Sequence, residues 1–535
     1  MTVAATTGVA TVRILVADPI ANDGVERLRA AGEVVVATGL SLDELKVRIA
    51  DVDALVVRSE TKVTAEVFEA APRLRVVGRA GVGVDNIDLD AATRHGVLVL
   101  NAPTGNTIAA AEHTVGMMLA MARNISRADA SMHAGRWDRK AFMGTELREK
   151  TLGLLGLGKI GFEVARISSQ GLKMRVIADD PLVTAERAEQ AGAELVDFET
   201  LLAQSDFLSV HVPLNDKTRG VIGAAELARM KKGARLINVA RGGIIDEQAV
   251  ADAVRDGHIG GAAIDVFTKE PALPENPLLS VPELVLTPHL GASTTEAQVN
   301  VATDVADQIV QYLAGVGPRY AVNLPSIQPE EMARLQPYLV LAEKMGSLAA
   351  QLAGEKVSRV VCSYAGELSK IEFSPLTAEV LRGLFGHFTD TRVNAINAKL
   401  VAKDHGVAVE ERTTTRDLDH ADALLVEVIG GTRLTLVGTQ FEGQPRITRI
   451  NDFRIDMDPN GLFLVVQHND RPGVVAKVSG LLASNDINIA GIELGRDRPR
   501  GRAVMLIQVD DPVGPELQVA LQAVADLESL RVVTL

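Results

Sequence analysis

A glycine-rich stretch at residues 151–161, TLGLLGLGKIG, constrains this chain more than any other feature. An apolar run leads into Gly156, Gly158 and Gly161 with the spacing G-x-G-x-x-G, which predicts a strand, a tight turn and the start of a helix. The first glycine forms the turn, the second lets a pyrophosphate approach the backbone, and the third lets helix and strand pack closely. Because a helix N-terminus also attracts phosphates, the stretch favours a dinucleotide site.

The residue that selects the dinucleotide is Asp180. It ends a second apolar run, RVIADD, roughly 20 residues beyond the glycine turn, where a dinucleotide fold places its ribose-binding acid. A carboxylate at this position accepts hydrogen bonds from the ribose hydroxyls of NAD and repels a 2′-phosphate. We therefore predict NAD as the cofactor.

Length and charge exclude several other classes of protein. At 535 residues the chain exceeds what one hydrophobic core supports, so roughly two to four domains are expected. The net charge of −14 argues against nucleic-acid and anionic-membrane partners, because both need a basic surface. The single cysteine, Cys362, excludes an intrachain disulfide and a cysteine-based zinc site, and we predict no metal. Without a signal peptide or a membrane-spanning apolar run, a cytoplasmic protein is expected.

Two successive regions alternate Val/Leu-rich runs with helical patterns, which predicts parallel sheets covered on both faces. The fold class is therefore α/β, with two doubly wound domains of Rossmann or flavodoxin type. A helical pattern at 293–313 follows the second region, and we expect it to return to the first sheet, which needs further cover. The predicted substrate domain is thus discontinuous, 11–106 with 293–325, and the NAD domain, 107–292, is inserted in it.

A proline-rich linker at 315–337 separates these regions from the C-terminal part. An α/β intervening domain is predicted at 326–457, with a hairpin turn at Gly430–Gly431. Residues 461–535 show the order βαββαβ, which is typical of a small ferredoxin-like module.

Three polar residues follow apolar strands of the second region: Arg241, Glu270 and His289. Ligands of open α/β sheets bind at the carboxyl ends of strands, so the three side chains are expected in one crevice. Histidine can take a hydroxyl proton near neutral pH, a carboxylate can orient its ring, and arginine can bind a substrate carboxylate through two nitrogens. Each of these residues alone could instead be a surface, capping or salt-bridge residue. Together they predict a site that oxidises a 2-hydroxy acid.

Four motifs resemble the D-isomer-specific 2-hydroxy-acid dehydrogenases: GLGKIG (156–161), NVARGGIID (238–246), AAIDVFTKEP (262–271) and TPHLGAST (287–294). The resemblance covers most of residues 12–325. It implies that Arg241 binds and orients the substrate and that Glu270 and His289 form the proton relay. It also implies that Asp265 accepts the nicotinamide carboxamide. The full set of implied NAD contacts is Gly156, Gly158, Lys159, Ile160, Gly161, Asp180, Val212, Val239, Ala240, Arg241, Asp265, His289, Leu290, Gly291 and Ala292.

The first region supplies the candidates for substrate specificity. Arg58 and Arg79 follow apolar strands, and a guanidinium matches the geometry of a phosphate. Solvated surface cations are the alternative interpretation. The resemblance also implies that backbone amides of the turn Gly81–Val82–Gly83 bind a substrate carboxylate. The predicted substrate contacts are Arg58, Ser59, Arg79, Val82, Gly83 and Asn101.

Within this family, the chain is most similar to the long members that oxidise D-3-phosphoglycerate in the first step of serine synthesis. Residues 465–494 resemble an ACT domain, a module that binds amino acids between paired copies. The resemblance implies L-serine as a feedback inhibitor, with His468, Asp470 and Asn488 as its contacts. It also implies a homotetramer, in which the helical segment 107–134 forms a dimer seam and Trp137, Arg139 and Lys140 reach the neighbouring site.

Three alternatives remain open from the residues alone. The enzyme could act on another D-2-hydroxy acid, such as glycerate or 2-hydroxyglutarate. The same fold also serves as an NAD-sensing corepressor without turnover, which the intact Arg241, Glu270 and His289 argue against. The ACT-like module could bind an amino acid other than serine.

Overall fold

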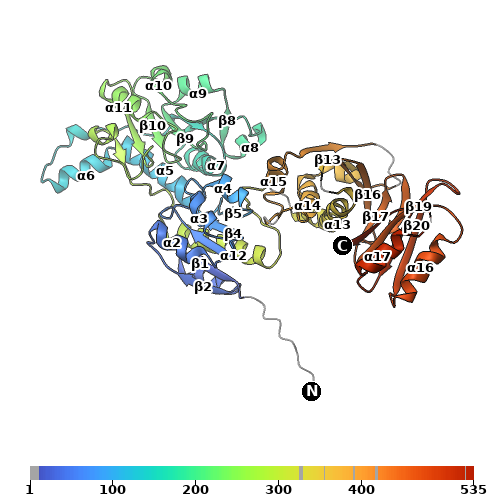
Figure 1. Ribbon diagram of the computed structural model, residues 1–535. Coiled ribbons are helices and arrows are strands. Elements are labelled where there is room, and N and C mark those ends of the chain that lie inside the picture. The colour runs from blue at the N-terminus through green and yellow to red at the C-terminus, as the bar shows by residue number, and fades with distance from the viewer. Residues whose placement is uncertain (1–10, 325–328, 355, 390–391, 416–419, 525) are drawn as a thin grey trace.

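The computed structural model describes residues 11–324, 329–354, 356–389, 392–415, 420–524 and 526–535. Their strands form four sheets that follow one another along the chain, with five, seven, six and four strands. The first two sheets with their helices lie on one side of the molecule, and the last two lie on the other (Figure 1). The predicted α/β fold class is confirmed. The boundary predicted between 325 and 326 falls outside the described residues.

The first sheet is parallel and has the order β2-β1-β3-β4-β5, which is that of a flavodoxin-like sheet. Its strands are short and rich in Val and Leu because helices cover both faces; all four residues of β3 are buried. Its elements are β1 (Arg13–Val16), α1 (Asn22–Leu28), β2 (Glu33–Val36), α2 (Leu42–Ile49), β3 (Ala54–Val57), α3 (Ala65–Glu69), β4 (Val76–Arg79), α4 (Leu89–Arg94) and β5 (Leu98–Asn101).

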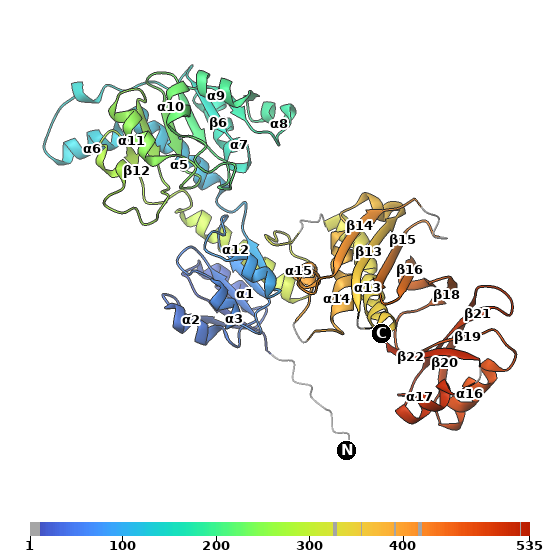
Figure 2. The same cartoon turned by 45° about the horizontal axis from the view of Figure 1, so that its top comes forward.

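Helix α12 (Thr295–Leu313) packs on this first sheet although the whole second sheet precedes it in sequence. Val301, Val305 and Ile309 share a buried cluster with the strands. The helix comes so close to β4 that a Cβ at Gly78 would lie 2.5 Å from Val305 and 2.6 Å from Ile309. Gly78 is therefore required for this packing. Figure 2 shows α12 beside the helices of the first unit, although it follows the second unit in sequence.

The second sheet has the order β12-β11-β10-β9-β6-β7-β8, all parallel. The order reverses between β6 and β9, and a crevice opens at the carboxyl ends of strands at such a point. The strands are β6 (Thr151–Leu155), β7 (Arg175–Asp179), β8 (Ala193–Leu195), β9 (Phe207–Val210), β10 (Arg235–Asn238), β11 (Gly261–Ile264) and β12 (Val285–Leu286). The sequence predicts six of them and misses β8, because three residues are too short to show a period.

The helices of this unit are α5 (Thr107–Ala122), α6 (Ile125–His133), α7 (Lys159–Arg166), α8 (Ala185–Gln190), α9 (Phe198–Gln204), α10 (Ala224–Arg229) and α11 (Glu247–Arg255). The single helix predicted at 107–134 is in fact two, since Asn124 has a φ of 54° and interrupts it. Helix α5 packs against α7 and contributes Ala111 and Val115 to the core beneath the second sheet.

The C-terminal half holds the other two sheets. The third has the order β14-β13-β15-β16-β17-β18, and the fourth has the order β20-β21-β19-β22 that a βαββαβ chain forms. The third unit consists of α13 (Pro329–Ala353), β13 (Val357–Ala365), α14 (Ser374–Phe385), α15 (Ala398–Asp404), β14 (Ala408–Thr413), β15 (Ala423–Gly430), β16 (Arg433–Phe441), β17 (Gln444–Ile450) and β18 (Phe453–Met457). The fourth consists of β19 (Leu462–Asn469), α16 (Val474–Ser484), β20 (Ile489–Arg496), β21 (Arg502–Val509), α17 (Pro515–Gln522) and β22 (Leu527–Thr534).

The predicted hairpin at Gly430–Gly431 is confirmed, because β15 and β16 pair antiparallel around it. The predicted linker is too long at its C-terminal end, since Pro337 lies inside α13. Among the described residues, no helix has both the length and the apolar character needed to cross a membrane.

Candidate active site

A cavity of about 670 Å³ lies between the first two units, at the carboxyl ends of their strands. Residues of both units line it, although most of them are far apart in sequence. The first unit contributes Arg58, Ser59, Arg79, Val82 and Gly83 from the predicted set, and the second contributes Arg241, Glu270 and His289. Predicted substrate and catalytic residues therefore meet in one cleft. Asn101 is not among the lining residues, but its Nδ2 donates to the carbonyl of Val82 at 2.6 Å and supports that turn.

Glu270 and His289 form a hydrogen-bonded pair at the edge of this cleft. The Nδ1 of His289 lies 2.8 Å from Oε2 of Glu270, and the other carboxylate oxygen accepts from the backbone N–H of Phe267 at 3.0 Å. Partial burial opposes the charge on Glu270, but these two hydrogen bonds outweigh it and lower the pKa of the carboxyl group below 4.5. The carboxylate is thus ionised at neutral pH, and the pairing leaves Nε2 of His289 as the ring nitrogen available to a ligand.

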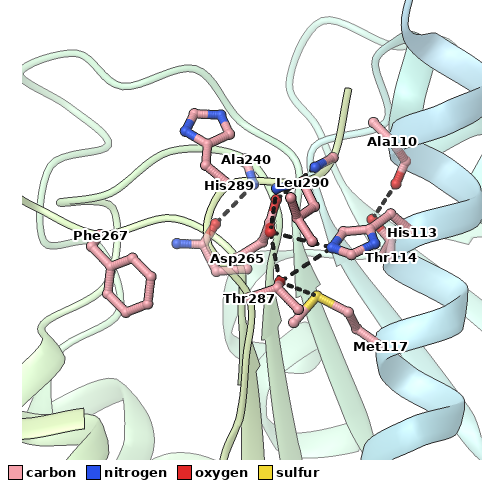
Figure 3. Close-up of polar contacts among 12 residues, drawn as sticks. Ala110, His113, Thr114, Met117, Ala240, Asp265, Phe267, Thr287, His289 and Leu290 are labelled. Carbon is pink, nitrogen blue, oxygen red and sulfur yellow. Dashed lines mark hydrogen bonds and ion pairs between the residues drawn. The ribbon is translucent and has the colours of Figure 1, made fainter. Parts of the chain in front are cut away.

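Asp265 lies behind this pair and holds the loop that carries His289. Its side chain is fully buried, and Oδ1 accepts from the Thr287 hydroxyl at 2.6 Å and from the N–H of Leu290 at 2.7 Å, while Oδ2 accepts from Gly291 at 2.9 Å. Figure 3 shows the carboxylate at the centre of these contacts, with the ring of His289 directed away from them. Burial opposes its charge, yet the hydrogen bonds from its neighbours lower the pKa of Asp265.

Arg241 lines the same cleft. Its Nη1 donates to the carbonyl of Ala240 at 2.7 Å and its Nε to Asp85 of the first unit at 3.2 Å. The guanidinium is so close to Gly83 that a Cβ there would lie 2.0 Å from Nη2. Gly83 therefore lets the arginine meet the predicted carboxylate-binding turn.

Arg58 and Arg79 add further positive charge to the same cavity. Burial, together with repulsion from Arg241 and Arg58, lowers the pKa of Arg79 to about 10. Its buried Nε has no hydrogen-bond partner among the described residues. Arg58 follows β3 in a turn that is held by buried Asp18, which accepts from the backbone N–H of Arg58 at 2.6 Å. Three guanidinium groups in one cleft favour a ligand with more than one negative charge.

A second cavity of about 410 Å³ adjoins this cleft and extends along the carboxyl ends of the second sheet. The predicted cofactor residues that line it are Ile160, Val212, Val239, Ala240, Arg241, His289, Gly291 and Ala292. Most of these residues present apolar side chains, and His289 and Arg241 line both cavities. The cofactor and substrate cavities therefore meet at Arg241 and His289, which the sequence predicts to bind the substrate and to take its proton.

The glycine turn has the shape that a dinucleotide needs. Gly156 has a φ of 94°, and a Cβ at Gly161 would lie 2.4 Å from the carbonyl oxygen of Gly156. A Cβ at Gly158, the N-cap of α7, would meet no atom of the described residues within 4 Å, which leaves open space over the helix N-terminus. Asp180 follows β7, and its Oδ2 accepts from the N–H of Leu157 at 2.8 Å. These residues fit NAD.

The remaining predicted cofactor residues lie outside the lining of the second cavity. Among them, Leu290 donates its backbone N–H to Asp265. The ammonium of Lys159 lies 5.5 Å from the centre of the Tyr320 ring.

Several lining residues were not predicted from the sequence. Asp85 and Asn106 line both cavities, and Gln298 lines the substrate cavity. His211 also lines the cofactor cavity, and desolvation of its ring lowers its pKa to about 4. Its position at the end of β9 was the one available signal. His113 contacts Asp265 from α5, and nothing in its local sequence indicates this contact.

The predicted effector residues lie at two separate places on the fourth sheet. His468 is buried, and its Nε2 has no partner among the described residues. Asp470 accepts from the N–H of Arg500 at 2.9 Å and from Arg496 at 3.2 Å. Asn488 precedes the opposite end of β20 and donates to Asp510 at 2.5 Å. The third predicted contact is thus remote from the other two within one chain.

Comparisons with known proteins identify the families to which parts of the chain are similar. Residues 115–291 match the NAD binding domain of the D-isomer specific 2-hydroxyacid dehydrogenases, 334–451 match the D-3-phosphoglycerate dehydrogenase intervening domain, and 463–526 match the ACT domain. A D-3-phosphoglycerate dehydrogenase of Archaeoglobus fulgidus is 46% identical, covering 94% of this chain and 96% of the relative. A Bacillus subtilis protein of the same name is 40% identical, covering 98% and 99%.

Solved structures match more than half of the chain. The TT0316 protein of Thermus thermophilus has 34% identity and a TM-score of 0.53, and covers 58% of this chain and 99% of its own. The NAD-dependent formate dehydrogenase of Staphylococcus aureus, solved with NAD, has 27% identity and a TM-score of 0.52, and covers 57% and 96%. The predicted NAD cofactor and dehydrogenase class are confirmed. The chain belongs to the D-3-phosphoglycerate dehydrogenases, within the D-isomer-specific 2-hydroxyacid dehydrogenase family.

Proposed function

We propose that this chain oxidises D-3-phosphoglycerate to 3-phosphohydroxypyruvate with NAD, the first step of serine biosynthesis. The observation that carries the proposal is the shared cleft, which is lined by the hydrogen-bonded Glu270–His289 pair and by arginines of both units. A 2-hydroxy acid needs a base and a carboxylate-binding group, and a phosphate needs additional cations. The names of the relatives support the same substrate.

In this proposal each part of the cleft has one task. Arg241 and the amides of Val82 and Gly83 bind the substrate carboxylate, which directs the hydroxyl group at C2 toward His289. Nε2 of His289 takes the hydroxyl proton, and the C2 hydrogen leaves as hydride. Glu270 stabilises the resulting imidazolium through Nδ1. NAD, held along the second cavity, would supply the acceptor for this hydride.

The phosphate is assigned to Arg58 and Arg79. Both line the cavity on the side of the first unit, and Arg79 is largely buried with an unpaired Nε among the described residues. An incompletely paired, desolvated guanidinium gains most from a dianion, because it has few competing hydrogen bonds with water. This assignment separates a phosphorylated acid from glycerate or 2-hydroxyglutarate.

A direct test measures NAD reduction with each of these three acids. We expect the highest kcat/KM with D-3-phosphoglycerate. Faster turnover of an unphosphorylated acid would contradict the substrate assignment while leaving the dehydrogenase class intact. Tight NADH binding without turnover of any acid would instead support the corepressor alternative.

We further propose that the fourth unit binds L-serine between two copies of the chain and thereby inhibits the enzyme. Strand β20 is at the edge of its sheet, with Asp470 near one end and Asn488 before the other. Antiparallel pairing of two β20 edges would bring Asn488 of one copy toward His468 and Asp470 of the next. Serine should inhibit turnover and glycine should not. Asn488→Ala should abolish the inhibition and preserve kcat, and an uninhibited wild-type enzyme would contradict the proposal.

Association of copies is also proposed for the α5–α6 arm, up to a homotetramer. Figure 1 shows α6 projecting from the second unit. Large apolar side chains are exposed on α6 and just after it, among them Ile125, Met132 and Trp137. Sedimentation of the full chain should show a tetramer, and Ile125→Glu should give smaller species. A wild-type monomer would contradict this proposal.

A further inference from the structure

His113 connects the long helix α5 to the network behind His289. Its Nε2 lies 3.2 Å from Oδ1 of Asp265 and 3.2 Å from the hydroxyl oxygen of Thr287. The imidazole side chain is 22% exposed, and the Asp265 carboxylate that it contacts is fully buried. Figure 3 shows the ring projecting from the helix toward Asp265 and Thr287. His113 therefore lies outside the two cavities but in direct contact with the residue that shapes their shared wall.

The hydrogen-bond pattern determines which nitrogen of His113 carries the proton. The hydroxyl hydrogen of Thr287 is directed to Asp265 at 2.6 Å, since the Met117 sulfur at 3.5 Å is a weaker acceptor. The oxygen of Thr287 is then an acceptor, and the ionised carboxylate accepts only. Nε2 of His113 must donate to satisfy either contact. The ring is thus a hydrogen-bond donor to a buried charge.

Asp265 also binds the backbone of the loop that carries His289. Its carbonyl oxygen accepts from the N–H of His289 at 2.8 Å, and its carboxylate accepts from Leu290 and Gly291. His289 has a φ of 56°, a left-handed conformation that a non-glycine residue adopts only when its surroundings hold it. Three consecutive N–H groups bound by one aspartate supply that restraint.

We propose that His113 is a positioning residue for His289, which it holds through the Asp265 carboxylate. The donor from α5 keeps the carboxylate oriented toward the N–H groups of Leu290 and Gly291, and these keep the backbone of His289 in its strained conformation. The ring of His289 is thereby aimed at Glu270 and the cleft. The inference rests on the proposed role of His289 as the base.

Three substitutions of His113 distinguish the effect of its hydrogen-bond donor from the effect of its ring size. Gln places an amide nitrogen about where Nε2 lies, whereas the shorter Asn reaches only the position of Nδ1, and Ala removes the group. We expect His113→Ala and His113→Asn to lower kcat about tenfold, as for loss of a hydrogen bond to a charged group, with KM for the hydroxy acid within about twofold. His113→Gln should retain kcat within about threefold.

The isotope effect and amide exchange identify the cause of the loss. With substrate deuterated at C2, the Ala and Asn variants should show a larger primary isotope effect on kcat than wild type, because a misplaced base slows the chemical step. In the ligand-free protein, amide hydrogens of residues 287–293 should exchange faster in these two variants than in wild type or His113→Gln. Equal melting temperatures would exclude a general loss of folding.

Two results would overturn the inference. One is unchanged kcat and unchanged amide exchange in both the Ala and the Asn variant. The other is an equal loss in all three variants, since ring size rather than the donor would then matter. Failure of wild-type turnover with every hydroxy acid would overturn the proposed function instead, and the amide exchange of the ligand-free variants would still test the contact with the loop.

Discussion

Arg241 donates to Asp85 across the cleft, with 3.2 Å between Nε and the carboxylate oxygen, although 156 residues separate the two in sequence. Asp85 follows the turn that is predicted to bind the substrate carboxylate, and Arg241 is predicted to bind the same group. The Asp85 carboxylate therefore occupies the guanidinium of Arg241 as the substrate carboxylate would. The substrate must compete with Asp85 for this arginine. The pair also joins the two units that enclose the cleft.

Asp85→Asn should consequently lower KM for the hydroxy acid. The Asp85 side chain is 69% exposed, and ion pairs of this kind contribute about 0.2–1 kcal/mol. KM should thus decrease by about 1.4–5-fold, with kcat unchanged. Asp90→Asn, an exposed acid outside the lining of the cavity, is the control in steady-state assays. An increase in KM for Asp85→Asn would show that the carboxylate assists binding.

His289→Ala should lower kcat by about 10²–10⁴-fold and leave NADH bound, because it removes the proposed base but only one of the residues that line the cofactor cavity. Glu270→Gln should give a smaller loss. The pKa of Glu270 is lowered, so its charge is present throughout the range above 4.5 and disappears only as the pH falls through the lower pKa of the folded state. The effect of Glu270→Gln should accordingly persist across neutral pH. Unchanged turnover in His289→Ala would refute the mechanism.

Gly158→Ala and Gly161→Ala should have opposite consequences. Alanine at 158 meets no described atom within 4 Å, so the protein should keep its melting temperature and bind NAD more weakly, since the methyl group enters the space for the phosphates. Alanine at 161 would lie 2.4 Å from a carbonyl oxygen and should destabilise the fold. Melting curves with and without NADH separate the two. Normal NADH affinity in Gly158→Ala would argue against the predicted position of the pyrophosphate.

Arg79→Gln should raise KM for the phosphorylated acid by about 10–100-fold, as expected for a charge-assisted hydrogen bond to a phosphate. Turnover of an unphosphorylated acid should change little, and this comparison is the internal control. Arg75→Gln, which changes an arginine outside the cleft lining, should affect neither substrate. An equal effect of Arg79→Gln on both acids would place Arg79 at the carboxylate rather than the phosphate.

His211 should make the stability of the protein depend on pH between about 6.5 and 4. Desolvation lowers its pKa to about 4, so the unfolded chain takes up a proton first as the pH falls. The free energy of unfolding therefore decreases as the pH falls from 6.5, by up to about 3 kcal/mol at pH 4. In scanning calorimetry, His211→Asn should lose less stability than wild type over this range. Equal pH dependence would show that the ring is protonated in the folded protein.

Much of the fold could be predicted because its signals are local. Alternating Val/Leu-rich runs and helical patterns locate every strand of the two parallel sheets except β8, and the glycine turn identifies the cofactor strand. The failures also have local causes. Strand β8 has only three residues, and Asn124 interrupts a helix by a left-handed φ that helical periodicity does not reveal. Pro337 suggests a linker but lies in a helix that continues through it.

The sequence by itself determined the class of chemistry, because each requirement of NAD-dependent oxidation has a local pattern. These patterns are the G-x-G-x-x-G turn, the acid after the next strand and the polar residues after later strands. Only the tertiary structure decided which groups meet. Arg241 pairs with Asp85, and His113 with Asp265 from 152 residues away, because two sheets and a crossing helix place them together. Such contacts depend on how packed layers are oriented, and neither composition nor spacing along the chain contains that information.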